Sequence, residues 1–207
     1  MKPALLSVGM AGVLAIAPSV ANPALAETVN AETWTSVSGA RSASSRDVAT
    51  TATYYALRAV TLWQYDRRPC ALDADESSLR ADLRVPLDRL RLCEPTLGRE
   101  WKQADVGSRR YVTAIAACRG KRDGAIHGIA LWGAAVGPNG QLVPARNPVF
   151  LQFRECTDWQ AKRACPAGSV ATGIRGYFSD ATGGVRGLSL RCRPLEAVAA
   201  NGTRHVG

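Results

Sequence analysis

Apolar and polar positions alternate with a period of two over two runs near the C-terminal end, residues 170–178 and 185–193. This period is typical of strands with one buried and one solvent-facing side. The segment 179–184 between them contains two glycines and an aspartate, which predict a turn. The buried side would carry Val170, Thr172, Ile174, Gly176, Phe178, Leu188, Leu190 and Cys192. The opposite side would carry arginines, so the sequence predicts a hairpin with a basic outer face.

A similar pattern recurs in the middle of the chain. Residues 112–115 (VTAI) match the start of 170–174 (VATGI), and residues 125–131 (AIHGIAL) match 184–190 (GVRGLSL). Trp101 precedes Val112 by eleven residues, and Trp159 precedes Val170 by the same eleven residues. The recurrence predicts that the same hairpin is built at least twice.

We extend this recurrence to three β units. Residues 87–93 (LDRLRLC) resemble 185–192 (VRGLSLRC) and would close the first unit. The units open near Trp34, Trp101 and Trp159 and end near Cys93, Cys156 and Cys192. Small units that cannot each bury a core must pack on one another. A threefold arrangement of small sheets in one domain, residues 48–196, would satisfy this need.

Some segments leave two interpretations open. Residues 48–63 suit a strand or a helix, and we favour a strand because the chain downstream is β-like. Residues 79–85 alternate as a strand, with a short helix ending before Pro86 as the alternative. Residues 137–148 are rich in Pro, Gly and Asn, which predicts an inserted loop.

The two ends of the chain have a different composition from this domain. Residues 1–26 have a basic start, an apolar run too short to favour a membrane span and an A-x-A cleavage pattern, which predict an export signal. Residues 27–47 are rich in Ser, Ala and Thr, and we expect a flexible lead-in with Trp34 as its only large apolar anchor. Residues 197–207 are expected to be a disordered tail. We therefore expect a secreted protein, extracellular or periplasmic.

All six cysteines lie after the export signal, at Cys70, Cys93, Cys118, Cys156, Cys165 and Cys192. An even count outside the cytoplasm indicates three disulfides. We predict pairing within each unit, as Cys70–Cys93, Cys118–Cys156 and Cys165–Cys192. The chain has no C-x-x-C and only two histidines, so we expect no metal site and no cofactor.

In the last unit Trp159 is followed by the turn 165–168 (CPAG) and the segment 180–192 (DATGGVRGLSLRC). Through these residues the unit resembles one repeat of the vitelline membrane outer layer protein family. The second acid of the family's D-D-T is Ala181 here, and the Asn before its Gly is Arg186. The resemblance implies a β-prism, in which three antiparallel sheets surround a pseudo-threefold axis, and a loose association with carbohydrate. We expect an all-β, disulfide-bonded, three-unit β-prism-like domain, with a β-sandwich as the alternative.

Charge adds a candidate ligand class. Without residues 1–26 the chain has 25 Lys and Arg against 17 Asp and Glu, a net charge of +8. The preference for Arg over Lys is typical of a bacterial sequence of high GC content. It also suits recognition of acidic groups, since guanidinium binds carboxylate, sulfate and phosphate in two-pronged fashion. The candidate binding residues are Arg175, Arg186, Arg191, Arg193 and, as a sugar-stacking platform, Trp132.

Other residues with functional chemistry have a structural interpretation that we prefer. His127 shares a face with apolar neighbours and is expected to be a satisfied, partly buried histidine. The acidic segment 73–76 would be a solvated loop, although its carboxylates also suit glycoside hydrolysis or calcium binding. Trp63, Trp101 and Trp159 are expected in the core. No residue is predicted to be catalytic.

Three functions remain as hypotheses. The leading one is a secreted, non-catalytic binding module for glycan or an acidic cell-envelope polymer. The second is a protein-binding role, such as an inhibitor of a secreted hydrolase, with the 137–148 loop as the inserted element. The third, a glycosidase that uses loop carboxylates, is the weakest. We expect no nucleic-acid partner, because the basic residues are scattered along the chain.

Overall fold

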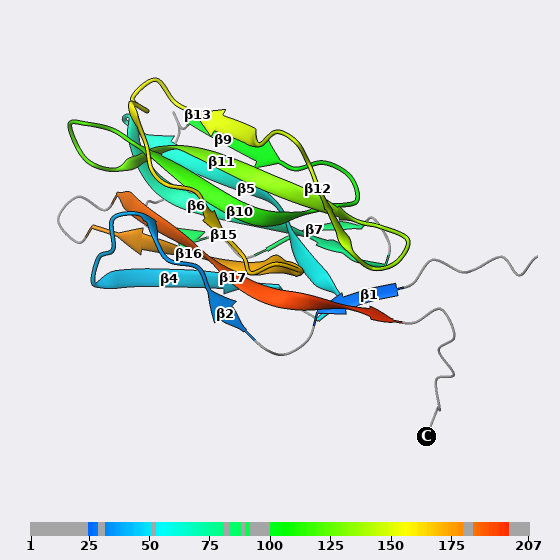
Figure 1. Cartoon of the computed structure of the whole chain (residues 1–207). Helices are drawn as coiled ribbons and strands as arrows, with labels where there is room; N and C mark the ends of the chain where they lie inside the picture. Colours follow the sequence, from blue (N-terminus) through cyan, green and yellow to red (C-terminus); the bar gives the residue numbers. More distant parts are fainter. Residues whose placement is uncertain are drawn as a thin grey trace, which may run out of the picture.

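The structure is a computed structural model that describes residues 25–28, 32–50, 53–80, 83–87, 90–91, 100–179 and 184–198. Within these ranges the chain forms β-strands joined by turns, and the strands build three antiparallel sheets (Figure 1). The all-β, β-prism prediction is confirmed. In the part of the chain that the structure describes, no helix is long and apolar enough to cross a membrane.

Sheet 1 is built around the hairpin of β5 and β6. Its strands are β5 (Tyr55–Tyr65), β6 (Arg68–Ser78), β7 (Arg84–Pro86), β8 (Leu90–Arg91) and β9 (Glu100–Asp105). β7 and β8 pair with β6, and β9 crosses over to pair with β5. The predicted strand at 79–85 is wrong in its start, because Leu79 and Arg80 form a bend and β7 begins at Arg84.

Sheet 2 repeats this arrangement around β10 and β11. Its strands are β10 (Arg110–Arg119), β11 (Ile126–Val136), β12 (Leu142–Pro144), β13 (Val149–Gln152), β14 (Asp158–Trp159) and β15 (Arg163–Ala164). β12 and β13 pair with β11, while β14 and β15 pair with β10. The predicted 137–148 insertion therefore contributes an edge strand, β12, to the sheet.

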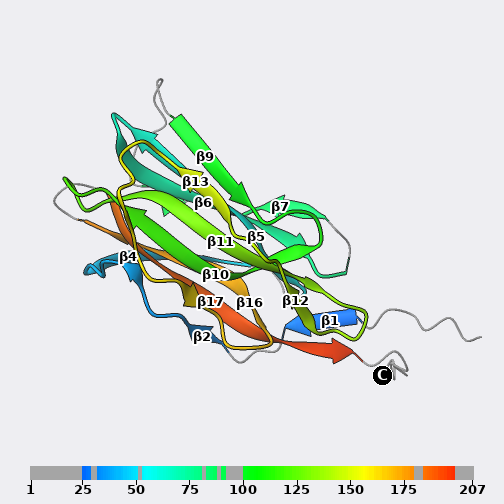
Figure 2. The same cartoon turned by 45° about the horizontal axis from the view of Figure 1, so that its top comes forward.

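Sheet 3 joins the two ends of the described chain. Its strands are β16 (Ser169–Phe178), β17 (Val185–Val198), β1 (Leu25–Thr28), β2 (Thr33–Trp34), β3 (Ser38–Gly39) and β4 (Ser44–Ala49). β1, β2 and β3 pair with β17, and β4 pairs with β16 (Figures 1 and 2). The hairpins of sheets 1 and 2 are flanked by strands that follow them in the chain. The hairpin of sheet 3 is flanked instead by strands from the N-terminal segment.

This pairing corrects the predicted flexible lead-in, 27–47, because much of it is strand. Without these N-terminal strands, the backbone N–H and C=O groups at the outer edges of β16 and β17 would have no hydrogen-bond partners. The composition concealed the strands, since β4 places only Val48 in the main core. The predicted tail, 197–207, is also wrong at its start, because Ala197 and Val198 lie in β17. Residues 199–207 and most of the predicted export signal, 1–24, lie outside the described residues.

Each long hairpin contains the same two irregularities. The first strand carries one extra residue before its middle, at Arg58, Thr113 or Thr172. The second strand carries one just after the hairpin turn, at Cys70, His127 or Arg186. Because a bulge shifts the pleat by one residue, its recurrence shows that the hairpins are structural repeats.

The bulges correct two sequence predictions. The matched stretches 125–131 and 184–190 are equivalent, but the counterpart in sheet 1 is β6 rather than 87–93. The bulge at Thr172 also reverses the alternation that we expected along β16. Ala171 and Ile174 both enter the main core, whereas Val170 joins a small cluster with Ala56 and Tyr111.

The core lies where the inner faces of the three sheets meet. Sheet 1 contributes Leu57, Val60, Leu62 and Leu72, sheet 2 contributes Val112, Ile115, Ile129 and Leu131, and sheet 3 contributes Ile174, Phe178, Leu188 and Leu190. All of these are at most 1% exposed. Burying one such side chain contributes about 1.5–3 kcal/mol, so a shared interior accounts for how three small sheets can be stable together.

Two of the predicted disulfides are confirmed. Cys118 is bonded to Cys156 and Cys165 to Cys192, with Cα–Cα distances of 5.4 and 5.6 Å. β13 ends at Gln152 and a turn at 154–155 precedes Cys156, which frees it from the alternation of that strand. Cys70 is also disulfide-bonded. Its predicted partner, Cys93, lies outside the described residues, so the Cys70–Cys93 pairing stays a prediction.

Candidate functional site

The outer face of sheet 1 carries a grid of polar and aromatic side chains. The strand register places Trp63 beside Trp101, and Thr61 between Asp73 and Gln103. One step further along, Ala59 lies between Asp75 and Asp105. These residues point outward because their neighbours Val60, Leu62 and Leu72 point into the core. The small Ala59 leaves room over the strand for the guanidinium of Arg84, which bonds to both carboxylates.

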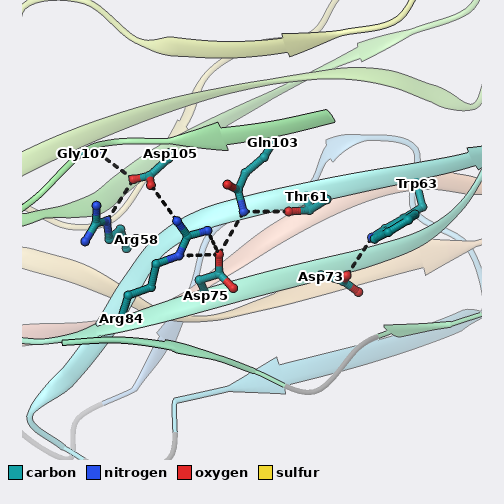
Figure 3. A network of polar contacts seen from close by, with 9 residues as sticks. All are labelled: Arg58, Thr61, Trp63, Asp73, Asp75, Arg84, Gln103, Asp105 and Gly107. Atoms are coloured by element: carbon teal, nitrogen blue, oxygen red, sulfur yellow. Dashed lines mark hydrogen bonds and ion pairs between the residues drawn. The ribbon is translucent and has the colours of Figure 1, made fainter. Parts of the chain in front are cut away.

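A groove of about 550 Å³ lies over this grid. We call it the tryptophan groove; its lining includes Thr61, Trp63, Asp73, Asp75, Arg84, Pro86, Trp101 and Gln103. Trp101 is 57% exposed, and its ring centroid lies 5.9 Å from that of Trp63. The indole Nε1–H of Trp63 donates to Oδ2 of Asp73 at 2.7 Å, which orients the ring (Figure 3). The prediction that these two tryptophans are core residues is wrong, because both line the groove on the outer face, with Trp63 partly buried and Trp101 exposed.

The polar end of the groove is held by a connected network (Figure 3). Oδ2 of Asp75 accepts hydrogen bonds from Arg84 and, at 2.9 Å, from the side-chain amide of Gln103. That amide also donates to the Thr61 hydroxyl at 3.0 Å. The network therefore holds Asp75, Gln103 and Arg84 in fixed positions on the face, with acceptors and donors close together.

Asp105 extends this network away from the tryptophans. Its two carboxylate oxygens accept from Arg84 at 3.3 Å, from Arg58 at 3.0 Å and from the Gly107 N–H at 2.8 Å. The connected network contains two carboxylates, Asp75 and Asp105, and two guanidinium groups, Arg58 and Arg84, while the separate Asp73 adds a further negative charge to the groove (Figure 3). Its charge is therefore not basic, which disfavours an acidic ligand and suits one that presents hydroxyl groups.

The predicted acidic loop is also corrected by this arrangement. Residues 73–76 lie within β6, so Asp73 and Asp75 share its outer face and Glu76 is buried. Their spacing, two residues apart, was visible in the sequence, as was the same spacing in Thr61 and Trp63 and in Trp101, Gln103 and Asp105. Three runs of outward polar residues flanking apolar positions were the signal that could have identified this face.

The predicted arginine face exists on sheet 3, but acids from the N-terminal segment occupy it. Arg193 Nε donates to Glu32 at 3.1 Å, Arg191 Nη1 lies 3.4 Å from the same carboxylate, and Arg175 Nη2 is 3.2 Å from Asp47. The guanidinium of Arg175 also lies over the ring of Trp34, 4.0 Å from its centroid. The three arginines converge as expected, and much of their charge is compensated within the chain.

Electrostatics on this face follow from these pairs. The hydrogen bond from Arg193 outweighs desolvation and, with the charge of Arg191, holds the pKa of Glu32 below its ordinary value. Burial lowers the pKa of the Arg191 guanidinium, an effect that Arg193 adds to and Glu32 opposes. These interactions attach β2 to β17, which gives the face a structural role.

The remaining predicted binding residues lie elsewhere. Arg186 occupies the bulge of β17, and its guanidinium approaches Gly124 in the turn between β10 and β11. Trp132, on β11, is partly buried beneath the ammonium of Lys162, which lies 4.6 Å from the ring centroid. The structure therefore does not bring Arg186 or Trp132 to the sheet 3 arginines. Trp159, predicted to be core, is 40% exposed and makes an edge contact with Phe150.

Comparison with known proteins identifies the fold. No protein-family profile matches the chain, and no curated protein matches it. Among solved structures, a Calsepa lectin in complex with a biantennary N-glycan matches with a TM-score of 0.53 and 12% identity, over 80% of this chain and 99% of the lectin. The Calystegia sepium agglutinin matches with a TM-score of 0.53 and 11% identity, over the same shares of the two chains.

At this identity the likeness concerns the fold alone. The β-prism implied by the family resemblance is therefore present, whereas membership of the vitelline membrane outer layer family stays a prediction. A mannose-binding jacalin-related lectin from Ananas comosus also matches, with a TM-score of 0.49 and 10% identity, over 79% of this chain and 98% of the lectin.

Proposed function

We propose that this protein is an exported, non-catalytic carbohydrate-binding module whose tryptophan groove holds uncharged sugar units. The observation that carries the proposal is the pair formed by the partly buried Trp63 and the exposed Trp101, which lies beside the Asp75–Gln103–Arg84 network. A sugar ring has an apolar C–H face and a rim of hydroxyl groups. The indole rings offer a surface for the first, and the fixed carboxylate, amide and guanidinium offer partners for the second.

The composition of the site favours binding over hydrolysis. Asp75 is held by two donors, Arg84 and Gln103, and Asp73 accepts from the Trp63 indole. A carboxylate in such contacts is suited to accept hydrogen bonds from hydroxyl groups. Two of the structural neighbours are a lectin bound to a biantennary N-glycan and an agglutinin, which supports a glycan ligand for the same fold.

Export is part of the proposal. Disulfides persist in oxidising compartments, and the described residues contain the Cys118–Cys156 and Cys165–Cys192 bonds. The predicted signal at 1–26 is consistent with the same destination. Detection of the protein in culture fluid or periplasm, with Glu27 as its first residue, would test this part.

Calorimetric titration with neutral oligosaccharides tests the binding. The probes are cellotetraose, xylotetraose, mannotetraose and a biantennary N-glycan. We expect at least one to bind, and Trp101→Ala to weaken that binding about tenfold or more, equivalent to about 1.4 kcal/mol. Trp159→Ala is the matched control, since it removes an exposed indole from sheet 2, and it should leave the affinity unchanged. Equal loss in both variants, or no binding of any probe, would refute the proposal.

A further inference from the structure

A second cavity, of about 650 Å³, lies where the turns of two sheets meet. It is lined by the β5–β6 turn, the β10–β11 turn and the connection from β13 to β14. We call it the end cavity. It contains none of the residues of the tryptophan groove.

Its lining is basic. Five of the lining side chains are cationic: Arg67, Arg68, Lys121, Arg122 and Arg154. Three are acidic: Asp66, Asp123 and Glu155. Among the described residues, none of the five cations forms an ion pair with a carboxylate. This distinguishes the cavity from the sheet 3 face, where Arg175 and Arg193 are both paired.

One of the three acids is committed to the protein itself. Asp123 accepts from the Ala125 N–H at 3.0 Å, and its other oxygen lies 2.9 Å from Nε2 of His127. Partial burial raises the pKa of Asp123, but these hydrogen bonds outweigh it, so the pKa is lowered and the carboxylate is ionised. Only Asp66 and Glu155 are left to oppose the five cations.

One residue that lines the cavity carries an unsatisfied polar atom. His127 lines the cavity and is fully buried, and its Nδ1 has no hydrogen-bond partner within the described structure. Native proteins pair the large majority of buried polar atoms with protein or ordered water, so an orphaned atom needs an explanation. The prediction of a satisfied, partly buried histidine is therefore wrong in two respects, because His127 is fully buried and only one of its ring nitrogens has a partner.

Arg67 lies in a turn whose backbone conformation is unfavourable for any residue with a side chain. Asp66 and Arg67 both have positive φ, 46° and 59°, in the two-residue turn between β5 and β6. Glycine is the favoured residue at the second position of such a turn. An arginine there costs backbone energy and places a cation at the cavity, and unfavourable backbone of this kind often marks a functional site.

Two further guanidinium groups meet at Gly124, in the β10–β11 turn that also lines the cavity. Nη2 of Arg186 and Nη2 of Arg119 lie 2.6 and 2.8 Å from the point that a Cβ on Gly124 would occupy. Gly124 directly follows the lining residue Asp123. Like charges held near one site raise its positive potential, which an anion relieves.

We propose that the end cavity binds an acidic sugar residue through its carboxylate or sulfate group. The five cations supply partners for the anionic group, and Asp66 and Glu155 can accept from neighbouring hydroxyl groups. A nucleic acid fits less well, because the two acids would repel a continuous phosphate backbone and the lining contains no Phe, Tyr or Trp for base stacking, while the ring of His127 is fully buried. The proposal is independent of the tryptophan groove.

Calorimetric titration of the full chain with tetragalacturonate and with a heparin tetrasaccharide tests it and separates carboxylate from sulfate. We expect at least one to bind, more weakly as salt rises. The double variant Arg67→Gly/Arg154→Ala should weaken binding at least tenfold. Because Gly suits the turn, its melting temperature should be unchanged or higher, so lost binding cannot be ascribed to misfolding.

The matched control is Arg110→Ala/Arg146→Ala, which removes the same charge from exposed positions outside the cavity. It should change the affinity less than twofold. Trp101→Ala should leave acidic-sugar binding intact. If the tryptophan groove does not bind sugar, only the neutral-oligosaccharide titrations will fail, and the acidic-sugar result will be unaffected. The proposal is overturned if neither acidic probe binds, if the control loses as much, or if Arg175→Ala/Arg193→Ala loses more. Tighter binding of single-stranded DNA through Arg67 and Arg154 would also overturn it.

Discussion

Glu32 and Arg193, 161 residues apart in the chain, are joined by a hydrogen bond on the outer face of sheet 3. Arg191 approaches the same carboxylate at 3.4 Å. The contact connects the segment before β2 to the last strand, β17. It is one of the interactions by which the N-terminal segment completes a sheet whose central hairpin comes from the other end of the described chain.

This pair predicts a pH dependence of stability. The pKa of Glu32 in the folded protein is below its ordinary value of 4.5. Its stabilisation is therefore complete above pH 4.5 and is lost as the pH falls through the folded-state pKa. For a solvent-screened pair we expect about 0.5 kcal/mol. Urea unfolding at pH 6 and pH 3 should show a smaller acid-induced loss for Glu32→Gln than for the parent, and an equal loss would contradict the assignment.

The Cys165–Cys192 bond should contribute strongly to stability. It closes a loop with a sequence separation of 27 and attaches the segment after β15 to β17. The chain-entropy relation gives about 3–4 kcal/mol for a loop of this length. The Cys165→Ala/Cys192→Ala variant should lose about this amount in urea unfolding at equilibrium. A loss below about 1 kcal/mol would mean that the bond contributes little beyond the β-sheet contacts.

Gly187 marks the closest approach of the N-terminal segment to β17. A Cβ at this position would clash with the backbone carbonyl of Ala40 and lie 2.7 Å from Cγ1 of Val37. Gly187→Ala should therefore destabilise by about 1–3 kcal/mol, as overpacking does. Gly168→Ala is the comparison, because its φ of 74° is strained but a Cβ there would meet nothing within 4 Å. If Gly168→Ala were the more harmful change, the close packing of β3 on β17 would be wrong.

The sequence predicted the sheets better than it predicted the sites. Alternation in 170–178 and 185–193 identified the last hairpin, and the match between 125–131 and 184–190 identified a true structural repeat. Both succeed because core residues must recur every second position along a strand. The bulge at Thr172 was not predictable from alternation, since one extra residue reverses which face the following residues occupy.

The features that the sequence did not predict depend on contacts between residues far apart in the chain. β2, β3 and β4 carry few apolar residues, so only their hydrogen bonding to β16 and β17 reveals them as strands. The predicted arginines converge, but the sequence could not show that Glu32 and Asp47 would reach them. Conversely, Asp75 and Gln103 lie on strands that are not adjacent in the chain, and their contact depends on how β6, β5 and β9 are ordered.

The indole N–H resonances of the five tryptophans, Trp34, Trp63, Trp101, Trp132 and Trp159, test the central claim most directly. Each is assigned by a Trp→Phe variant and followed in ¹⁵N–¹H spectra during titration with the neutral oligosaccharide that binds best. The tryptophan groove predicts that the Trp63 and Trp101 signals shift progressively with ligand, while those of Trp34, Trp132 and Trp159 stay in place. Shifts confined to Trp132 or Trp159, or binding that moves none of the five signals, would contradict the claim.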